Sequence, residues 1–180
     1  MSSLLTLLFA PSFLLLIHYF AFEQVVILYI IFSLLLLFYA YQKKKKFEDF
    51  IVLGIYVVLL SVAYFYASID IVKFIPVFTT MAFFTLFAEA TLHKKELILK
   101  LTQKFYKKEL SNAEVEYLKL GDIYWSISIL IYMFIQIGLV FFATDELWAL
   151  YSSLGWYVYF LIVLGFQIIY GKFYAIKMSA

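Results

Sequence analysis

The chain has 180 residues, of which 66% are hydrophobic and 14% charged, and its net charge at neutral pH is +2. Soluble domains average about 45–50% apolar and about 25% charged residues, so this composition excludes an ordinary soluble domain and predicts a membrane protein. The chain has no cysteine, which excludes disulfides, thiolate metal ligands and thiol nucleophiles.

Apolar stretches long enough to cross a bilayer, which takes about 17–25 residues, recur along the chain. In chain order they cover about residues 4–22, 25–41, 50–67, 71–92, 120–143 and 147–170. Because the backbone must satisfy its own hydrogen bonds in lipid, and because these runs lack the alternation of barrel strands, each is predicted to be a helix. The predicted fold is an all-α bundle of six transmembrane helices in one integral membrane domain, residues 1–180, with one interfacial amphipathic helix.

The lysines predict the orientation of this bundle. Lys43–Lys46 precede the third stretch, seven lysines lie between the fourth and the fifth, and Lys172 and Lys177 follow the sixth. Short loops rich in lysine stay in the cytoplasm, so both termini are expected there in a multi-pass protein of the plasma membrane. The opposite loops carry mainly acidic residues, namely Glu23, Asp70, Asp145 and Glu146.

The cytoplasmic loop, residues 93–119, contains an amphipathic pattern. Its apolar face consists of Leu97, Ile98, Leu101 and Phe105, and its basic face of Lys100, Lys104, Lys107 and Lys108. This pattern predicts a helix in the membrane interface, with the lysines toward anionic headgroups. The spacing of Ser111 and Glu114 matches a capping box and predicts that the fifth helix begins near Asn112.

Ionisable residues at the cytoplasmic ends of the stretches form the candidate site. Glu89 is expected either at headgroup depth, paired with Lys94 or Lys95, or in a functional site inside the membrane. Asp122 is either a carboxylate at membrane entry or a polar contact to Glu89 or to the interfacial helix. The second interpretation defines a lipid-headgroup or polar site of Glu89, Asp122, Lys94 and Lys95.

Other polar residues in the stretches are expected to have structural roles. Lys73 can extend its long side chain to the surface and pair with Asp70, three residues earlier. His18 is expected to hydrogen-bond a neighbouring helix, and Gln136 and Gln167 are expected to join helices.

No combination of residues predicts catalysis. The two histidines, His18 and His93, lie in different parts of the chain, and no Ser-His-Asp arrangement, glycine-rich phosphate loop or metal-ligand spacing occurs. The sequence therefore predicts no catalytic residues, no metal site, no cofactor and no enzymatic activity. Basic residues gather in loops rather than on one face, which argues against a nucleic-acid partner.

A family resemblance covers about residues 74–171. It rests on segments in a characteristic order and spacing: Pro76-Val77-Phe78, Leu86-Phe87, Leu97–Leu101, Tyr117, Trp125 and Trp148-Ala149-Leu150-Tyr151. The chain resembles a family of small, mostly uncharacterised bacterial inner-membrane proteins, often encoded with genes for aryl-polyene or xanthomonadin-type lipid synthesis. It departs from the family pattern at Ser152-Ser153, at Leu99-Lys100 and at Gln167.

The resemblance implies a place in the bacterial inner membrane and a connection with lipid or polyene synthesis. The first functional hypothesis is a non-enzymatic accessory or scaffold, with anionic membrane lipids and cytoplasmic lipid-synthesis enzymes as partners. The alternative is a small transporter or flippase for a lipid-linked product. That alternative needs a polar path through the bundle, since transport pathways carry inward-facing ionisable groups.

Overall fold

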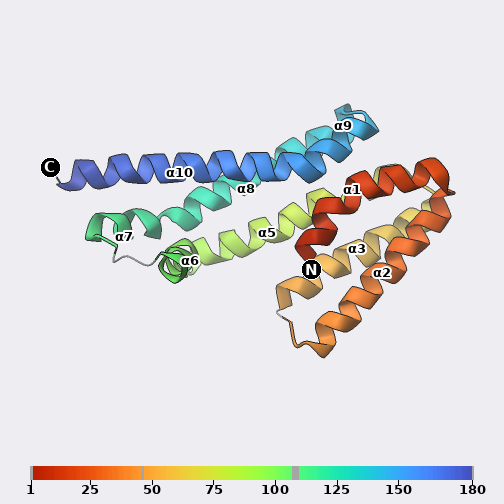
Figure 1. The fold of residues 1–180 in the computed structure, drawn as a ribbon, viewed down its shortest axis with the longest axis horizontal. Coiled ribbons are helices and arrows are strands. Elements are labelled where there is room, and N and C mark those ends of the chain that lie inside the picture. Colours follow the sequence, from red (N-terminus) through yellow and green to blue (C-terminus); the bar gives the residue numbers. More distant parts are fainter. Residues whose placement is uncertain (1, 46, 107–109, 180) are drawn as a thin grey trace. The chain divides into compact units, whose positions relative to one another are not determined.

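The computed structural model describes residues 2–45, 47–106 and 110–179 (Figure 1). Within these ranges the chain forms helices joined by turns, and no strand occurs among the described residues. The all-α prediction is therefore confirmed. Four helical segments of the described chain are long and apolar enough to cross a membrane.

These four segments agree with four of the predicted stretches. They are α2 (Phe22–Gln42), α4 with α5 (Ile69–Lys73 and Ile75–Leu92), α7 with α8 (Asn112–Lys119 and Gly121–Phe142), and α9, η1 and α10 (Asp145–Leu150, Tyr151–Gly155 and Trp156–Ser179). The first and third predicted stretches lie in α1 (Ser2–Tyr19) and α3 (Phe47–Tyr66). The apolar parts described in these two helices, Leu8–Tyr19 and Phe50–Tyr66, are shorter.

Three of the predicted stretches contain a local departure from the α-helix. The fourth breaks at Phe74, just before Pro76, which stands in the first turn of α5, where its missing N–H has no helical partner to lose. The fifth has an interruption at its first residue, Leu120, which separates α7 from α8, and the sixth contains the π-helical turn η1. A π turn is rare and inserts one residue into the helical ladder, so it changes which side chains face the neighbouring helices.

The chain divides into two compact units, each formed from separate segments. Unit 1 contains residues 1–82 and 133–156, and unit 2 contains residues 83–132 and 157–180. In unit 1, α2 and α3 form a hairpin and pack side by side, while α1 contacts both of them and also α9 and η1.

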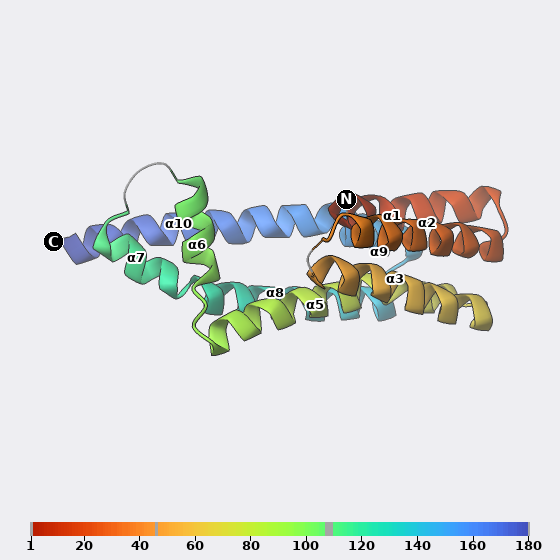
Figure 2. The same cartoon turned by 90° about the horizontal axis from the view of Figure 1, so that it is seen from below.

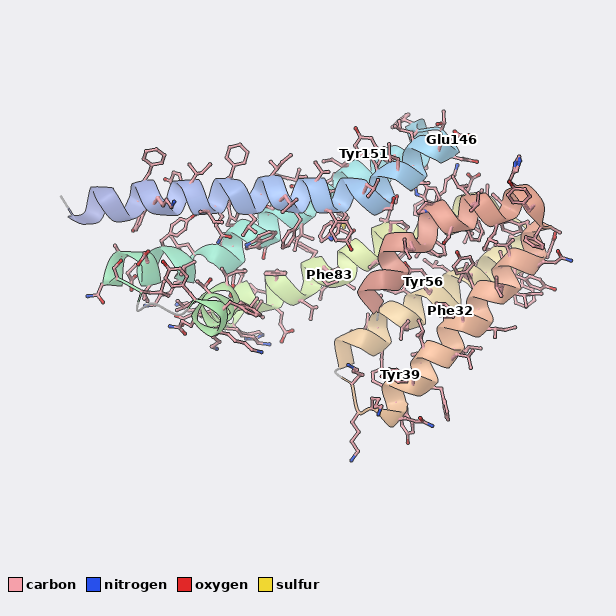
Figure 3. The ribbon with its side chains drawn as sticks, viewed as in Figure 1. Phe32, Tyr39, Tyr56, Phe83, Glu146 and Tyr151 are labelled. Carbon is pink, nitrogen blue, oxygen red and sulfur yellow. The ribbon has the colours of Figure 1, made fainter. Side chains whose placement is uncertain are left out.

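The core of unit 1 is aromatic. Phe9 packs edge-on against Tyr29 and Tyr56, with ring centroids 5.2 and 4.9 Å away, and this geometry is favourable for aromatic pairs. Figure 3 labels Tyr56 of this core together with Phe32 and Tyr39 of α2. Tyr56 is buried, whereas Phe32 and Tyr39 are exposed. Large apolar residues on the outside of a helix are expected where the surrounding solvent is lipid.

Unit 2 is arranged around Trp125 of α8. Its ring packs against Phe87 of α5 and Phe160 of α10, with centroid distances of 6.2 and 4.8 Å, and it clusters with Ile98 and Val163. The short helix α6 (Leu97–Phe105) runs across the other helices of this unit. It is seen end-on beside α5 in Figure 1 and along its length in Figure 2, where α10 runs perpendicular to it.

Candidate functional site

Helix α6 is attached to α8 by a carboxylate. Asp122 Oδ2 accepts a hydrogen bond from the backbone N–H of Leu97, and Oδ1 accepts one from that of Ile98, both at 2.9 Å. The residue before α6, Glu96, has a left-handed backbone (φ 52°) and makes no side-chain cap of its own. Free N–H groups and the helix dipole make a helix N-terminus favourable for a negative charge, so Asp122 caps α6 from another helix.

A glycine next to this cap allows α6 to approach closely. A β-carbon built on Gly121 would lie 2.7 Å from Cγ2 and 2.8 Å from Cβ of Ile98, closer than carbon atoms approach in proteins. Ile98 is buried in the cluster with Trp125 and Val163. The contact therefore requires glycine at position 121, and the two adjacent residues Gly121 and Asp122 together hold the start of α6. We call this arrangement the α6 clamp.

The burial of α6 differs around its axis and also along its length. Ile98 and Leu99 are buried, while Leu101 and Phe105 are exposed, with Phe105 at 76% of its full accessibility. Lys100 and Lys104 are exposed on the side opposite Ile98 and Leu99. Ile98 and Phe105 are seven residues apart and share one face with Leu101, as predicted, but Ile98 at the start of α6 is buried whereas Phe105 at its end is exposed. Leu99, which the predicted face did not include, is buried as well.

The remaining residues of the candidate site have other partners. Glu89 is exposed, and its carboxylate bonds the ammonium group of Lys95 at 2.5 Å. This is the exposed pair that the first interpretation of Glu89 predicted. Lys94 is also exposed, with a left-handed backbone (φ 48°), and Lys100 Nζ donates to the carbonyl oxygen of Lys95.

The two carboxylates of the candidate site are thus engaged separately. Both oxygens of Asp122 serve the backbone of α6, and Glu89 binds Lys95. The predicted contact of Asp122 with the amphipathic helix before the fifth stretch, α6, is present. The predicted lysines Lys107 and Lys108 lie outside the described residues.

The predicted capping box is confirmed. The Ser111 hydroxyl accepts from the N–H of Glu114, and the Glu114 carboxylate accepts from the N–H of Ser111, so that α7 begins at Asn112. Tyr117, one turn further along, donates its hydroxyl to the carbonyl oxygen of Gln167 at 2.7 Å. A β-carbon on Gly171 would lie 2.7 Å from this tyrosine ring, so a second glycine permits close contact, here between α7 and α10.

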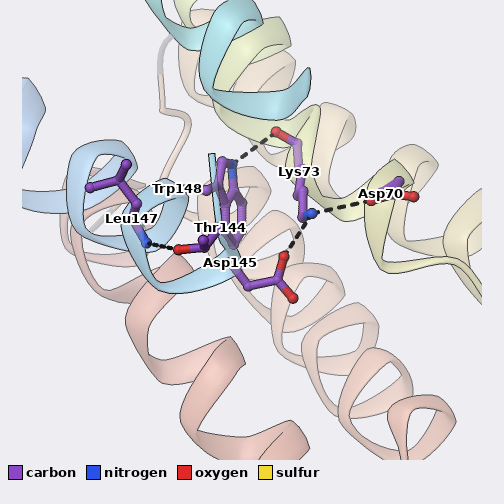
Figure 4. Close-up of polar contacts among 6 residues, drawn as sticks. All are labelled: Asp70, Lys73, Thr144, Asp145, Leu147 and Trp148. Atoms are coloured by element: carbon purple, nitrogen blue, oxygen red, sulfur yellow. Dashed lines mark hydrogen bonds and ion pairs between the residues drawn. The ribbon is translucent and has the colours of Figure 1, made fainter. Parts of the chain in front are cut away.

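A second group of charged residues lies in unit 1 (Figure 4). Lys73, 8% exposed, places its ammonium group 3.2 Å from Asp70 Oδ1 and 2.7 Å from Asp145 Oδ1. Trp148, fully buried, donates its indole N–H to the carbonyl oxygen of Lys73 at 3.3 Å. We call these residues the Lys73 cluster. The Asp70 pair was predicted, but Lys73 is buried instead of extending into solvent.

Two of the three remaining polar predictions hold. Gln136 accepts from the hydroxyl of Ser152 at 3.1 Å, and Gln167 accepts from the indole N–H of Trp125 at 2.8 Å, so both glutamines join helices as expected. The third prediction is wrong, because His18 is exposed in the last turn of α1 and packs edge-on against its neighbour Tyr19. An apolar run alone does not indicate which side of its helix faces outward.

The fold and these contacts define the class of this protein as all-helical, with four helices of membrane-spanning length among the described residues. Among those residues, no group of three or more His, Asp or Glu side chains is placed to hold a metal ion. No family model matches the chain, and no curated protein or solved structure matches it significantly.

Proposed function

We propose that the chain is a non-enzymatic accessory or scaffold of the bacterial inner membrane that serves lipid or polyene synthesis. The observation that carries this proposal is the α6 clamp, which holds an amphipathic helix across the spanning helices of unit 2. A helix fixed in this way offers a constant surface to lipids and to cytoplasmic lipid-synthesis enzymes. The family resemblance supplies the biochemical context.

In this proposal α1 and α3 also cross the membrane, which gives six crossings and two cytoplasmic termini. The Lys73 cluster supports the part of this topology that lies between Asp70 and Asp145, namely the crossings by α5 and α8. Asp70 and Asp145 come from the two turns expected outside, between the third and fourth and between the fifth and sixth crossings, and both bind Lys73. Such a contact requires the two turns to lie on one side of the bilayer.

Reporter fusions test the topology. A phosphatase that is active only in the periplasm should be active when fused after Asp70 or Asp145 and silent when fused after Lys45 or Tyr106. Activity after Lys45 would overturn the six-crossing arrangement, because this position lies in the loop with the densest positive charge.

A deletion strain tests the accessory function against transport. For an accessory, cells without the chain should make less lipid or polyene product, and the complete chain should restore synthesis. For a transporter or flippase, the product should form at a normal rate but accumulate on the cytoplasmic side of the membrane. Normal synthesis and normal distribution of the product would contradict both functions.

A further inference from the structure

Three properties of α6 together indicate what it contacts. The helix runs across the other helices of unit 2, so it lies parallel to the bilayer plane when those helices cross the membrane. One side is buried at Ile98 and Leu99, and Ile98 touches the clamp. The opposite side carries Lys100 and Lys104, and Leu101 and Phe105, further along the helix toward its end, are exposed.

The apolar side is adjacent to the basic one. At 100° per residue, Phe105 lies about 20° and Leu101 about 60° from the direction of Ile98, and Lys104 lies about 60° beyond Leu101. Lysine side chains at such a boundary bury their methylene groups and raise the ammonium group to the headgroups. Apolar residues beside lysines are what an interfacial helix presents to an anionic bilayer.

We propose that the exposed side of α6, formed by Leu101 and Phe105 with Lys100 and Lys104, binds the anionic headgroup layer of the cytoplasmic leaflet. The positive charge of the lysines is complementary to that layer, and the two large apolar side chains reach the boundary of the acyl chains. This inference depends on the topology of the proposed function, since α6 must lie on the cytoplasmic face. Asp122 acts as a positioning residue that holds this side at a constant depth.

The absence of cysteine in the chain makes a direct test possible, because one introduced cysteine carries one label. Phe105→Cys places an environment-sensitive fluorophore on the proposed lipid side. Gln103→Cys is the matched control, because Gln103 is also exposed but lies about 160° around the helix from Phe105. The complete labelled chain is placed in nanodiscs of phosphatidylcholine alone or of equal parts phosphatidylcholine and phosphatidylglycerol.

In the anionic discs, the label at position 105 should emit at shorter wavelength and be quenched by a lipid-soluble quencher, and the label at 103 should show neither effect. Lys100→Gln with Lys104→Gln should reduce the anionic preference, by about fivefold per lysine, and high salt should do the same. Asp122→Asn should make the depth of the label at 105 more variable.

Equal emission of the two labels in both lipids would overturn the inference and would point to a protein partner on this side of α6. Quenching at 105 to the same extent in both lipids would overturn the anionic preference. The reporter fusions separate these results from a failure of the proposed function. If the fusion at Tyr106 is silent while the label stays in water, the topology stands and only the lipid contact is wrong.

Discussion

The Lys73 cluster and the α6 clamp each bury one charged group, but they satisfy it differently. Lys73 is neutralised by two carboxylates that remain partly exposed, with Asp70 and Asp145 side chains at 73% and 43% of full accessibility. Asp122 is 3% exposed and satisfied by two backbone N–H groups. The comparison shows that a buried ionisable residue can be satisfied by charged partners or by backbone N–H groups alone.

Because the charges are satisfied differently, substitutions in the two arrangements should destabilise the protein to different extents. Water can still hydrate the two carboxylates if Lys73 is lost, which limits the cost. The N–H groups of Leu97 and Ile98 both donate to Asp122, and the bond from Ile98 is buried, so that loss of the acceptor costs the full desolvation energy of that donor. We therefore expect the stability of the α6 clamp to depend mainly on the charge of Asp122. The stability of the Lys73 cluster should depend mainly on the packing of its side chains.

Packing in the Lys73 cluster should give the largest effect. Trp148→Ala removes a fully buried ring and should lower the free energy of unfolding by about 3–5 kcal/mol. Trp148→Phe keeps most of the packing and loses only the bond to the Lys73 carbonyl, so it should cost about 1 kcal/mol. Thermal unfolding in detergent micelles measures both. Equal losses would mean that the hydrogen bond, and not the ring, stabilises the cluster.

Removing the carboxylate of Asp122 from the α6 clamp should give the second-largest loss of stability. Asp122→Ala leaves two N–H groups without their acceptor and should destabilise α6 by about 2–4 kcal/mol. Asp122→Asn, which keeps one acceptor oxygen, should cost less. Hydrogen exchange of the Leu97 and Ile98 amides should accelerate about a hundredfold in the alanine variant, while amides of unit 1 stay protected. Unchanged exchange would show that α6 is held without its cap.

Removing the cation of the cluster should have a smaller effect. Lys73→Met keeps the buried stem and leaves Asp70 and Asp145 facing each other, at a cost of about 1–2 kcal/mol because both carboxylates reach water. The double variant with Asp145→Asn relieves the repulsion and should regain part of the loss. A double variant less stable than Lys73→Met would contradict this account.

The effect of close packing at Gly121 can be measured separately from the effect of glycine on helix propensity. Gly121→Ala forces a shift of Ile98 at a cost of about 1–3 kcal/mol, offset by about 1 kcal/mol of improved helix propensity. Gly138→Ala is the matched control in the same helix, since nothing lies within 4 Å of its new β-carbon, and it should be neutral or stabilising. The same change in melting temperature for both variants would exclude a role of close approach.

The exposed pair should give the smallest effect. Glu89→Gln breaks only the contact with Lys95, and both side chains are about half exposed, so melting temperature and cellular function should stay unchanged. Loss of function in a variant that inserts and accumulates normally would instead support a functional site at Glu89. The same phenotype in Asp122→Asn would then extend that site to both carboxylates.

Local patterns of the sequence predict a large part of this structure. The all-α class and the helical stretches follow from continuous apolar runs, because the backbone of such a run must bond to itself in lipid. The start of α7 follows from the spacing of Ser111 and Glu114, and the pair of Asp70 and Lys73 follows from their separation by three residues. The pairing of Glu89 with a lysine just beyond α5 was also predicted.

The partners that lie far apart in the chain depended on tertiary structure. Asp145 binds Lys73, and Asp122 caps a helix 24 and 25 residues earlier, because packing places these segments side by side. The division of the predicted face of α6 into a buried Ile98 and an exposed Phe105 has the same cause. By itself, the sequence determined which segments are helical and apolar, since those properties depend on neighbours in the chain. Only the tertiary structure decided which side of each helix is covered and which backbone groups receive a charge, since those depend on the packing between helices.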